Sequence, residues 1–400
     1  MVTRERRILV LTFYYPPDLA AGSFRAHALV EALLQQSWDV RIDVITALPN
    51  RYSTFQLDAP EEETSERLTI RRIPIPSHRS GMYDQARAFA TFARGAAAVA
   101  RGARYDMVFA TSSRLMTATL GAWVARRQRA PLYLDLRDIF VDTIKDVLPR
   151  GSLLFRPIFS MQERWTMRRA AHVNLVSPGF SPYFSRRYPT RAFSFYTNGV
   201  DPEFARPDAN RRQKTDARTP PFMVVYAGNL GEGQGLHAII PAIAKRLVDR
   251  ASFTVIGDGG RRDRLQATLT DMDVRNVELV PPMSRERLIE QYERADILFL
   301  HLNDYDAFEK VLPSKIFEYA ALGKPIWAGV AGYAARFLSD EVENSAVFRP
   351  CDVEEALLAF ERLTVRDAPR EAFVRKYSRT RIMSDMGADL LARIGSGSSK

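Results

Sequence analysis

Residues Leu312 to Ile326 read LPSKIFEYAALGKPI, and this stretch decides how the second half of the chain is interpreted. Pro313 marks a turn, the next residues place apolar side chains at helical spacing, and GKPI restarts as a strand. Lys315 and backbone N–H groups would lie at a helix N-terminus, with the carboxylate of Glu318 about one turn further in. This arrangement suits a ligand that carries a diphosphate and a sugar hydroxyl.

Short apolar runs alternate with helical patterns along both halves of the chain. In the first half we expect strands at 8–12, 40–46, 68–73, 107–111, 132–135 and 172–177. In the second half we expect them at 222–227, 253–256, 277–280, 297–302 and 325–330. Such alternation is typical of parallel sheets covered by helices on both faces. We therefore predict an α/β fold of two Rossmann-like, doubly wound domains that face a central cleft, where ligands bind at the carboxyl ends of the strands.

The length of 400 residues exceeds what one hydrophobic core usually serves, so two domains are expected. Residues 206–221 are polar, lack apolar periodicity and include Pro220-Pro221, as in a linker. We predict an acceptor-side domain at 1–205 and a nucleotide-sugar-binding domain at 222–376. A last helix within 377–394 could return to the first domain.

Composition restricts the partners and the setting. A net charge of +10 and a pI near 9.7 favour an acidic partner, such as a nucleotide-sugar, nucleic acid or an anionic membrane. Cys351 is the single cysteine, so an internal disulfide is excluded, and the five histidines are scattered, which argues against a Cys/His metal site. No run approaches the roughly 20 apolar residues that span a bilayer. We expect a cytoplasmic protein whose membrane contact, if any, is peripheral.

Two glycine clusters follow strands of the second half. The first runs from Gly228 to Gly235, and the second, Gly257 to Gly260, is followed by Arg261. Glycines there let backbone N–H groups approach a phosphate without side-chain obstruction. For each cluster the alternative is an ordinary strand-to-helix turn, because neither is a Walker A loop or a strict GxGxxG motif.

In their order and spacing, these motifs resemble those of family 4 glycosyltransferases with the GT-B fold. The matching segments are Asn198-Gly199-Val200-Asp201, the loop at Gly228, Ile256-Gly257-Asp258-Gly259, and Ser314 to Tyr319 with Gly323-Lys324-Pro325. Tyr15-Pro16-Pro17 with Gly22 resembles the acceptor-side loop of that family. Within the family, the chain most resembles transferases of bacterial surface-polysaccharide assembly, including those acting on N-acetyl-fucosamine-type sugars.

The resemblance implies which residues bind the nucleotide-sugar. They are Gly228, Asn229, Gly231, Gln234, Gly257, Arg261, Ser314, Lys315, Ile316 and Glu318. Asn229 and Gln234 stand near the positions of the usual basic pair, so Lys315 is the leading phosphate cation and catalytic candidate, with Arg261 second. Glu318 would bind the ribose. Lys310 occupies the position of the first glutamate of the usual pair, and the neighbouring Glu309 is one residue off.

On the acceptor side, Asp135-Leu136-Arg137-Asp138 ends a predicted strand. We expect Asp138, the second catalytic candidate, or Asp135 to orient an acceptor hydroxyl or take its proton. An Asp-Arg-Asp ion-pair cluster is the alternative. Gly22 would let backbone approach the donor phosphate, and Arg25 could assist.

Two further segments invite interpretation. Asp304-Tyr305-Asp306 spells DxD, which can bind Mg²⁺ or Mn²⁺ with a diphosphate, but the surrounding pattern belongs to a metal-independent fold. We therefore expect no metal and no cofactor, and assign this loop to donor sugar hydroxyls. Phe155 to Arg169 mixes bulky apolar residues with arginines and could lie on an anionic membrane, or it could be an ordinary packed helix.

The combined prediction is a retaining glycosyltransferase that moves a sugar from a UDP-sugar to a lipid-diphosphate-linked saccharide in cell-surface polysaccharide synthesis. Such chemistry asks mainly for positioning and for stabilisation of the leaving diphosphate. Two alternatives remain: a sugar-nucleotide epimerase of the same architecture, and a basic nucleic-acid-binding protein. Against the second, the arginines are dispersed and no nucleic-acid module is recognisable.

Overall fold

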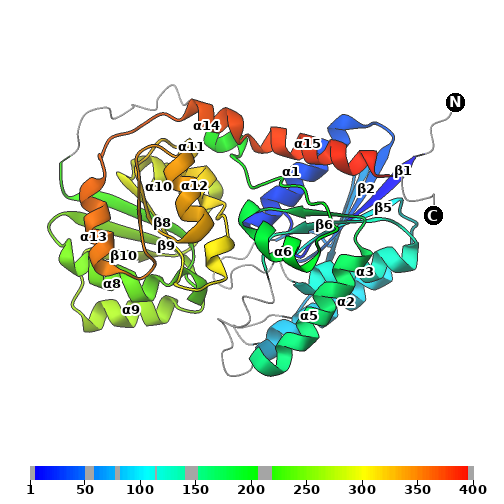
Figure 1. Cartoon of the computed structure of the whole chain (residues 1–400), viewed down its shortest axis with the longest axis horizontal. Coiled ribbons are helices and arrows are strands. Elements are labelled where there is room, and N and C mark those ends of the chain that lie inside the picture. The colour runs from blue at the N-terminus through cyan, green and yellow to red at the C-terminus, as the bar shows by residue number, and fades with distance from the viewer. Residues whose placement is uncertain are drawn as a thin grey trace. The chain divides into compact units, whose positions relative to one another are not determined.

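A computed structural model of the chain describes residues 5–49, 58–76, 82–112, 115–139, 152–205 and 219–394. The described residues form two compact units, each with its own sheet (Figure 1). The first unit takes in the described residues of 1–51, 56–197 and 379–400. The second takes in those of 198–378. We describe each unit by itself.

The sheet of the first unit has the strand order β3-β4-β2-β1-β5-β6-β7. Its parallel strands are β1 (Arg6–Leu11), β2 (Val40–Ala47), β4 (Leu68–Ile73), β5 (Met107–Thr111), β6 (Leu132–Leu136) and β7 (His172–Leu175). The short edge strand β3 (Glu62–Thr64) runs antiparallel to β4. The order reverses between β1 and β5, so ligands are expected where the loops after these two strands diverge.

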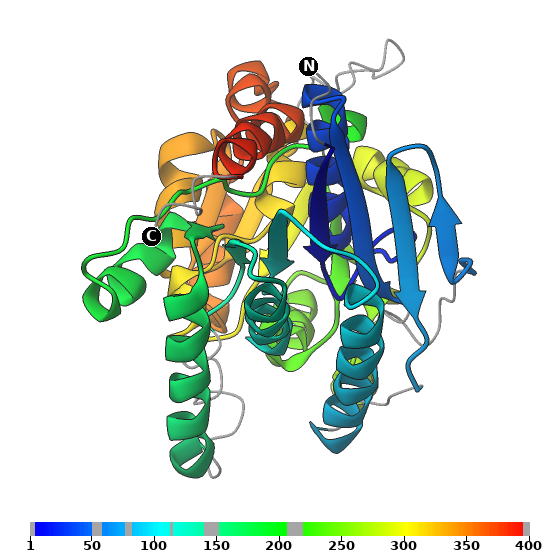
Figure 2. The same ribbon diagram turned by 90° about the vertical axis from the view of Figure 1, so that its right-hand side faces the viewer.

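Helices cover both faces of this first sheet (Figure 2). One face carries α1 (Ala21–Gln36) and α15 (Arg379–Ala392), whose apolar side chains share a core with β1 and β2. The other carries α2 (Met82–Ala100), α3 (Leu115–Gln128) and α5 (Ser152–Arg169). The short elements η1 (Pro178–Phe180) and α6 (Ser181–Arg187) follow β7.

The second sheet has the order β10-β9-β8-β11-β12-β13, and all neighbouring strands pair in parallel. Its strands are β8 (Phe222–Asn229), β9 (Ala251–Asp258), β10 (Val277–Val280), β11 (Ile297–His301), β12 (Ile326–Gly329) and β13 (Ser345–Phe348). The order reverses between β8 and β11. This is the doubly wound arrangement that the alternating pattern predicted.

Helices of the second unit also lie on two faces (Figure 1). One apolar core contains residues of α8 (Leu236–Arg246), α9 (Arg262–Asp271) and α13 (Val353–Arg362). The other contains residues of α7 (Pro202–Ala205), α10 (Arg285–Arg294), α11 (Lys315–Ala321), α12 (Gly332–Glu341) and α14 (Glu371–Lys376). Short 3₁₀ turns, η2 (Glu232–Gln234) and η3 (Phe308–Lys310), follow β8 and β11.

The unit boundary differs from the predicted one. It falls between Thr197 and Asn198 rather than after residue 205, because Val200 and Phe204 are buried in the core of the second unit. Most of the predicted linker, 206–218, lies outside the described residues. The last helix, α15, belongs to the first unit. Within the second unit the entering and leaving segments are joined, because Val200 and Ser378 form a β-bridge.

Two strands were missing from the sequence-based assignment. The edge strand β3 carries Glu62 and Glu63, so it lacks the run of apolar residues from which the other strands were predicted. Strand β13 (Ser345–Phe348) has only four residues. The predicted final strand of the second domain is therefore not its last.

Candidate nucleotide-sugar site

The described loops after β8 and β11 leave the second sheet at the point where its strand order reverses. The loop after β8 contains the first glycine cluster, and the loop after β11 contains Asp304-Tyr305-Asp306. In open α/β sheets, ligands bind outside the carboxyl ends of the strands at such a point. Topology therefore makes these two loops the candidate binding site of the second unit.

Lys315 lies beside Gly228 in this site. Its Nζ is 5.5 Å from the centroid of the Tyr226 ring, and a Cβ atom added at Gly228 would collide with Nζ and Cε of Lys315. The absence of a side chain at position 228 thus leaves the space that the lysine occupies. Because α11 has only seven residues, we attribute the positive potential here to the ammonium group rather than to a helix dipole.

Gly257 has a structural explanation that the phosphate-loop prediction did not include. It pairs in register with Gly228 on the neighbouring strand, and both residues have a φ of +144°. A Cβ atom at Gly257 would collide with the carbonyl oxygen of Gly228. This glycine therefore permits the close approach of β8 and β9, whether or not it also contacts a ligand.

Arg261, the second cation of the prediction, is engaged within the site. Its Nε donates to a carboxylate oxygen of Glu232, and the hydroxyl of Tyr305 donates to the other oxygen at 2.9 Å. Partial burial alone would raise the pKa of Glu232, but these two partners lower it below its ordinary value. Arg261 is thus paired with Glu232, and the assignment of Lys315 as the main phosphate cation rests on its position beside Gly228 and stays a prediction.

Asn229 and Gln234 bond to each other. The side-chain amide of Asn229 donates to Oε1 of Gln234 at 2.7 Å, and the Asn229 carbonyl accepts from the hydroxyl of Tyr226 at 2.8 Å. The residues near the positions of the usual basic pair thus close the glycine loop without adding charge. Gly231 lies between them, where a Cβ atom would collide with the amide of Asn229.

The remaining predicted donor residues belong to the start of α11. Ile316 is fully buried, so only its backbone could reach a ligand. Ser314 precedes the helix and makes no capping hydrogen bond through its side chain. Glu318 is half-buried, and its charge contributes to the raised pKa values of Arg285 and Tyr319.

The structure does not place a glutamate where the family has its first one. Lys310 folds back, and its Nζ donates to the carbonyl of Asp306 at 3.2 Å. The side chain of Glu309 is exposed, and its backbone carbonyl packs against Gly332. Asp304 and Asp306 are exposed as well. Across the described ranges, no three His, Cys, Asp or Glu side chains are grouped so that they could hold a metal ion.

Sequence reasoning missed His301, which is fully buried at the end of β11. Its Nδ1 is 2.7 Å from the carbonyl oxygen of Gln234, and its Nε2 accepts the backbone N–H of Cys351 at 3.0 Å. Burial lowers its pKa to about 4, so the ring is neutral at physiological pH. The available signal was the alternation of His301, Asn303 and Tyr305 after a strand, which places polar side chains at every second position.

In the first unit, Arg25 and Asp135 form a buried, two-pronged ion pair. Nε and Nη2 of Arg25 donate to the two carboxylate oxygens at 2.7 and 2.9 Å, and the side chains are 3% and 1% exposed. Asn174 also donates to Asp135, at 2.8 Å. Asp135 is thus paired with Arg25 rather than within the expected Asp-Arg-Asp cluster, and contact of this carboxylate with an acceptor would first require the pair to break.

Asp138 is exposed on the first unit, whereas Gly22 is buried at the start of α1. Reduced solvation raises the pKa of Asp138 toward neutrality against the opposing charge of Arg137, although the side chain keeps contact with solvent. This direction suits a proton acceptor. A Cβ atom at Gly22 would collide with the guanidinium of Arg137, so the glycine makes room for that arginine.

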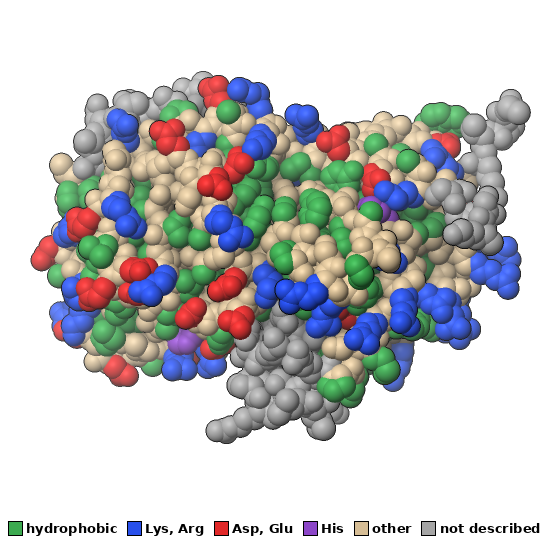
Figure 3. Space-filling view, in the orientation of Figure 1, with side chains coloured by type: hydrophobic (Ala, Val, Ile, Leu, Met, Phe, Trp, Pro, Cys, Tyr) green, Lys and Arg blue, Asp and Glu red, His purple; other side chains and the backbone are tan. Residues whose placement is uncertain are grey.

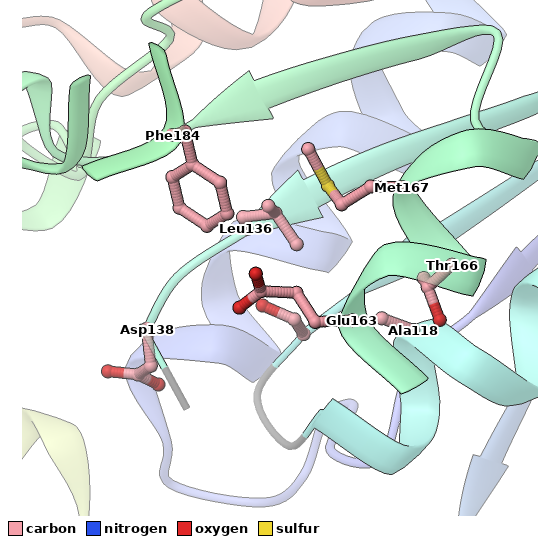
Figure 4. Close-up of a pocket in the computed structure, with 8 residues that line it drawn as sticks. Ala118, Leu136, Asp138, Glu163, Thr166, Met167 and Phe184 are labelled. Carbon is pink, nitrogen blue, oxygen red and sulfur yellow. The ribbon is translucent and has the colours of Figure 1, made fainter. Parts of the chain in front are cut away.

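A small pocket beside Asp138 contains a second missed residue, Glu163 of α5 (Figure 4). The two oxygens of this buried carboxylate accept hydrogen bonds from Tyr188 at 3.1 Å and Tyr183 at 3.0 Å. Phe184 contributes to the apolar lining. The sequence offered one signal, an acidic residue alone among arginines.

Comparison with known proteins identifies the family. The model for the glycosyl transferase 4-like domain matches residues 22–192, and the model for glycosyl transferases group 1 matches residues 208–380. Together the two matches run through nearly the whole chain. The chain belongs to the family 4 type of GT-B glycosyltransferases.

One named relative and two solved structures illustrate the likeness. The colanic acid biosynthesis glycosyl transferase WcaI of Escherichia coli K12 is 30% identical over 112 residues, which are 28% of this chain and 27% of that protein. The sucrose-phosphate synthase of Thermosynechococcus elongatus has a TM-score of 0.68 at 15% identity, covering 97% of this chain and 94% of its own. The Anabaena protein HepE, solved with UDP-glucose, has a TM-score of 0.66 at 15% identity, covering 96% and 99%.

Proposed function

We propose that this protein is a retaining glycosyltransferase that moves a sugar from a UDP-sugar to a lipid-linked saccharide in the assembly of a cell-surface polysaccharide. The observation that carries this proposal is the placement of Lys315 beside Gly228, where the second sheet reverses its strand order. The name of the WcaI relative and the UDP-glucose complex of HepE agree with such a reaction.

On this proposal, residues of the second unit hold the donor. The ammonium of Lys315 binds the diphosphate and stabilises the charge that grows as the bond to the sugar breaks. Glu318 accepts hydrogen bonds from the ribose. Because the lysine supplies this charge, we propose that transfer needs no metal ion and no cofactor.

Residues of the first unit would hold the acceptor. Asp138 orients the attacking hydroxyl or accepts its proton, a role that its raised pKa supports. An epimerase would need acid and base groups at the sugar ring in the second unit. There Glu232 is paired with Arg261, and Asp304 and Asp306 are exposed, so this alternative is not favoured.

A lipid-linked acceptor would require contact with a membrane, and we propose that the first unit provides it. Residues 1–197 and 379–400 contain 32 Lys and Arg against 19 Asp and Glu, whereas residues 198–378 contain 25 against 28. Figure 3 shows basic side chains gathered on the face of the first unit, at the right, where acidic ones are sparse. Anionic lipid headgroups attract such a surface.

Apolar side chains lie on the same unit. On α5, Ile158 is 54% exposed and Met161 is 69% exposed. Met116 of α3 is their neighbour, because its sulfur accepts a hydrogen bond from Gln162 of α5 at 3.0 Å. Of the predicted segment Phe155 to Arg169, the side chains of residues 155 and 156 lie outside the described residues. No helix among the described residues is long and apolar enough to cross a membrane.

The deciding experiment is a thermal-shift and calorimetric screen of UDP, GDP and their sugars against the full-length protein. UDP should raise the melting temperature in proportion to the logarithm of its concentration over Kd. A second arm supplies UDP-sugars with and without chelator and a membrane extract as acceptor source. Failure of all nucleotides to bind would overturn the proposal, and release of a new nucleotide-sugar without acceptor would identify an epimerase.

A further inference from the structure

Three side chains at the end of β11 and just after it contact the same loop. His301, Asn303 and Tyr305 occupy alternate positions, and each bonds to part of the glycine loop between Gly231 and Gly235. The backbone turns after β11, where the N–H of Tyr305 donates to the carbonyl of Asn303 at 2.9 Å. None of the three was named among the predicted nucleotide-sugar-binding residues, although the Asp304-Tyr305-Asp306 loop was assigned to donor sugar hydroxyls.

His301 links the loop to a second turn. The Gln234 carbonyl can only accept, so Nδ1 of His301 carries the proton, and the lone pair on Nε2 accepts from the N–H of Cys351. The hydrogen bonds to Gln234 and Cys351 together fix the ring in the tautomer with its proton on Nδ1. The ring also stacks on Phe299, with centroids 6.1 Å apart and an interplanar angle of 5°. The imidazole is thus fixed in position, and it fixes Gln234 in turn.

Asn303 holds the middle of the loop by two bonds. Its backbone N–H donates to the carbonyl of Gly233, and its side-chain amide donates to the carbonyl of Glu232, each at 2.9 Å. The same side chain packs against Gly235, where a Cβ atom would lie 3.1 Å from it. Gly235 has a φ of +59°, a conformation that glycine adopts readily.

Tyr305 holds the acidic side chain of the loop through its 2.9 Å hydrogen bond to Glu232. Its ring lies 5.5 Å from that of Phe308, which in turn packs against Gly233. The DxD sequence of the earlier prediction therefore contributes its central tyrosine to the loop, while its two aspartates are exposed.

We propose that His301, Asn303 and Tyr305 are positioning residues that hold the glycine loop in its donor-binding conformation before the donor arrives. The inference rests on the proposed function, because it assumes that this loop receives the diphosphate. A loop with glycines at 231, 233 and 235 loses much conformational entropy when it becomes ordered. Contacts that order it in advance remove this cost from binding, and they do so in a chain that lacks the usual basic pair.

The test compares UDP binding by the full-length protein and its Tyr305→Phe variant, which removes one hydroxyl and keeps the ring. Tyr333→Phe, a half-buried tyrosine on α12, is the matched control. We expect Tyr305→Phe to weaken UDP about fivefold to tenfold, the worth of one net hydrogen bond, with only a small fall in the melting temperature of the free protein. Hydrogen exchange at the amides of residues 233–235 should accelerate. If Tyr305 stabilised another part of the protein instead, exchange at these amides would not change.

A second pair of variants addresses the histidine. His301→Gln keeps one donor and one acceptor, whereas His301→Leu keeps neither, so the glutamine should restore part of the UDP affinity and of the amide protection that the leucine loses. In steady-state transfer, the change should appear in the donor KM more than in kcat. Wild-type UDP affinity and amide protection in Tyr305→Phe would overturn the inference even if His301→Leu fails to fold. Absence of UDP binding by the wild-type protein would instead refute the proposed function.

Discussion

The two units share one architecture and use it differently. In each unit the order of the parallel strands reverses, between β1 and β5 in the first unit and between β8 and β11 in the second. At the reversal point of the second unit lie glycines, a lysine and a hydrogen-bond network that includes the Glu232–Arg261 ion pair. In the first unit the corresponding edge is closed by the ion pair of Arg25 with Asp135. The fold supplies an edge for chemistry, and the residues on that edge decide what it does.

The largest expected effect is on the free energy of unfolding, which we expect to fall much more for a variant of the first unit than for one of the second. Arg25→Met would leave Asp135 buried without its cation, which should cost about 3 to 5 kcal/mol of unfolding free energy. Arg246→Met in the second unit removes an exposed partner of Glu354 and should cost at most about 1 kcal/mol. Urea denaturation followed by circular dichroism measures both. Equal, small effects would mean that the buried pair is not a structural element.

A pH titration compares one buried histidine from each unit. The folded pKa of His301 lies near 4, below the ordinary value near 6.5, so the unfolded state binds the proton first. The neutral His301 ring therefore contributes about 3 kcal/mol to the free energy of unfolding above pH 6.5, and this contribution is lost as the pH falls toward 4. Burial and the charge of Arg393 likewise lower the pKa of His172 to about 4, against the opposing charge of Asp389 at 3.5 Å, so the loss of stability at this histidine should be similar.

Unfolding free energies at pH 7 and pH 4.5 for wild type, His301→Gln and His172→Gln would check this prediction. The difference between the two pH values should shrink by a similar amount for each variant, since the carboxylates common to all three proteins cancel. An unchanged difference in either variant would mean that its histidine does not contribute to the pH dependence.

Lys315→Ala should weaken nucleotide binding, whereas Arg25→Met should act on stability. Loss of a charge-assisted contact is worth roughly 1.5 to 3 kcal/mol, or about tenfold to a hundredfold in UDP affinity. Lys310→Ala, whose ammonium folds back on Asp306, is the matched control. If calorimetry gave wild-type affinity for Lys315→Ala while Arg261→Ala abolished binding, the phosphate charge would belong to the second glycine cluster.

The smallest expected effect concerns the surface charge of the two units. Replacing Arg164 and Arg168 of α5 by Gln should weaken sedimentation with vesicles containing phosphatidylserine by about 1 kcal/mol per residue. The same change at Arg264 and Arg275 of the second unit, both exposed, should have little effect. Equal binding of wild type to neutral and anionic vesicles would remove the membrane proposal.

Much of the second unit could be predicted from sequence because its signals are local. The strand, turn and helix around Lys315 span fifteen residues, and the resemblance to family motifs pointed to Gly228, Gly257 and Glu318. The contacts that decide their roles are not local. His301 bonds partners 67 and 50 residues away, and Arg25 pairs with a residue 110 positions along the chain. A linear pattern cannot show that Asp135 is neutralised or that Arg261 is engaged, because both facts depend on the folded sheet.

The β-bridge between Val200 and Ser378 has a consequence for how the molecule can be dissected. Because the ends of the second unit meet, residues 198–378 form a continuous segment whose own termini lie side by side. This segment could be expressed as a single-domain fragment, and its new termini could be linked to make circular permutants. Donor recognition would then be open to solution NMR on about half of the original mass.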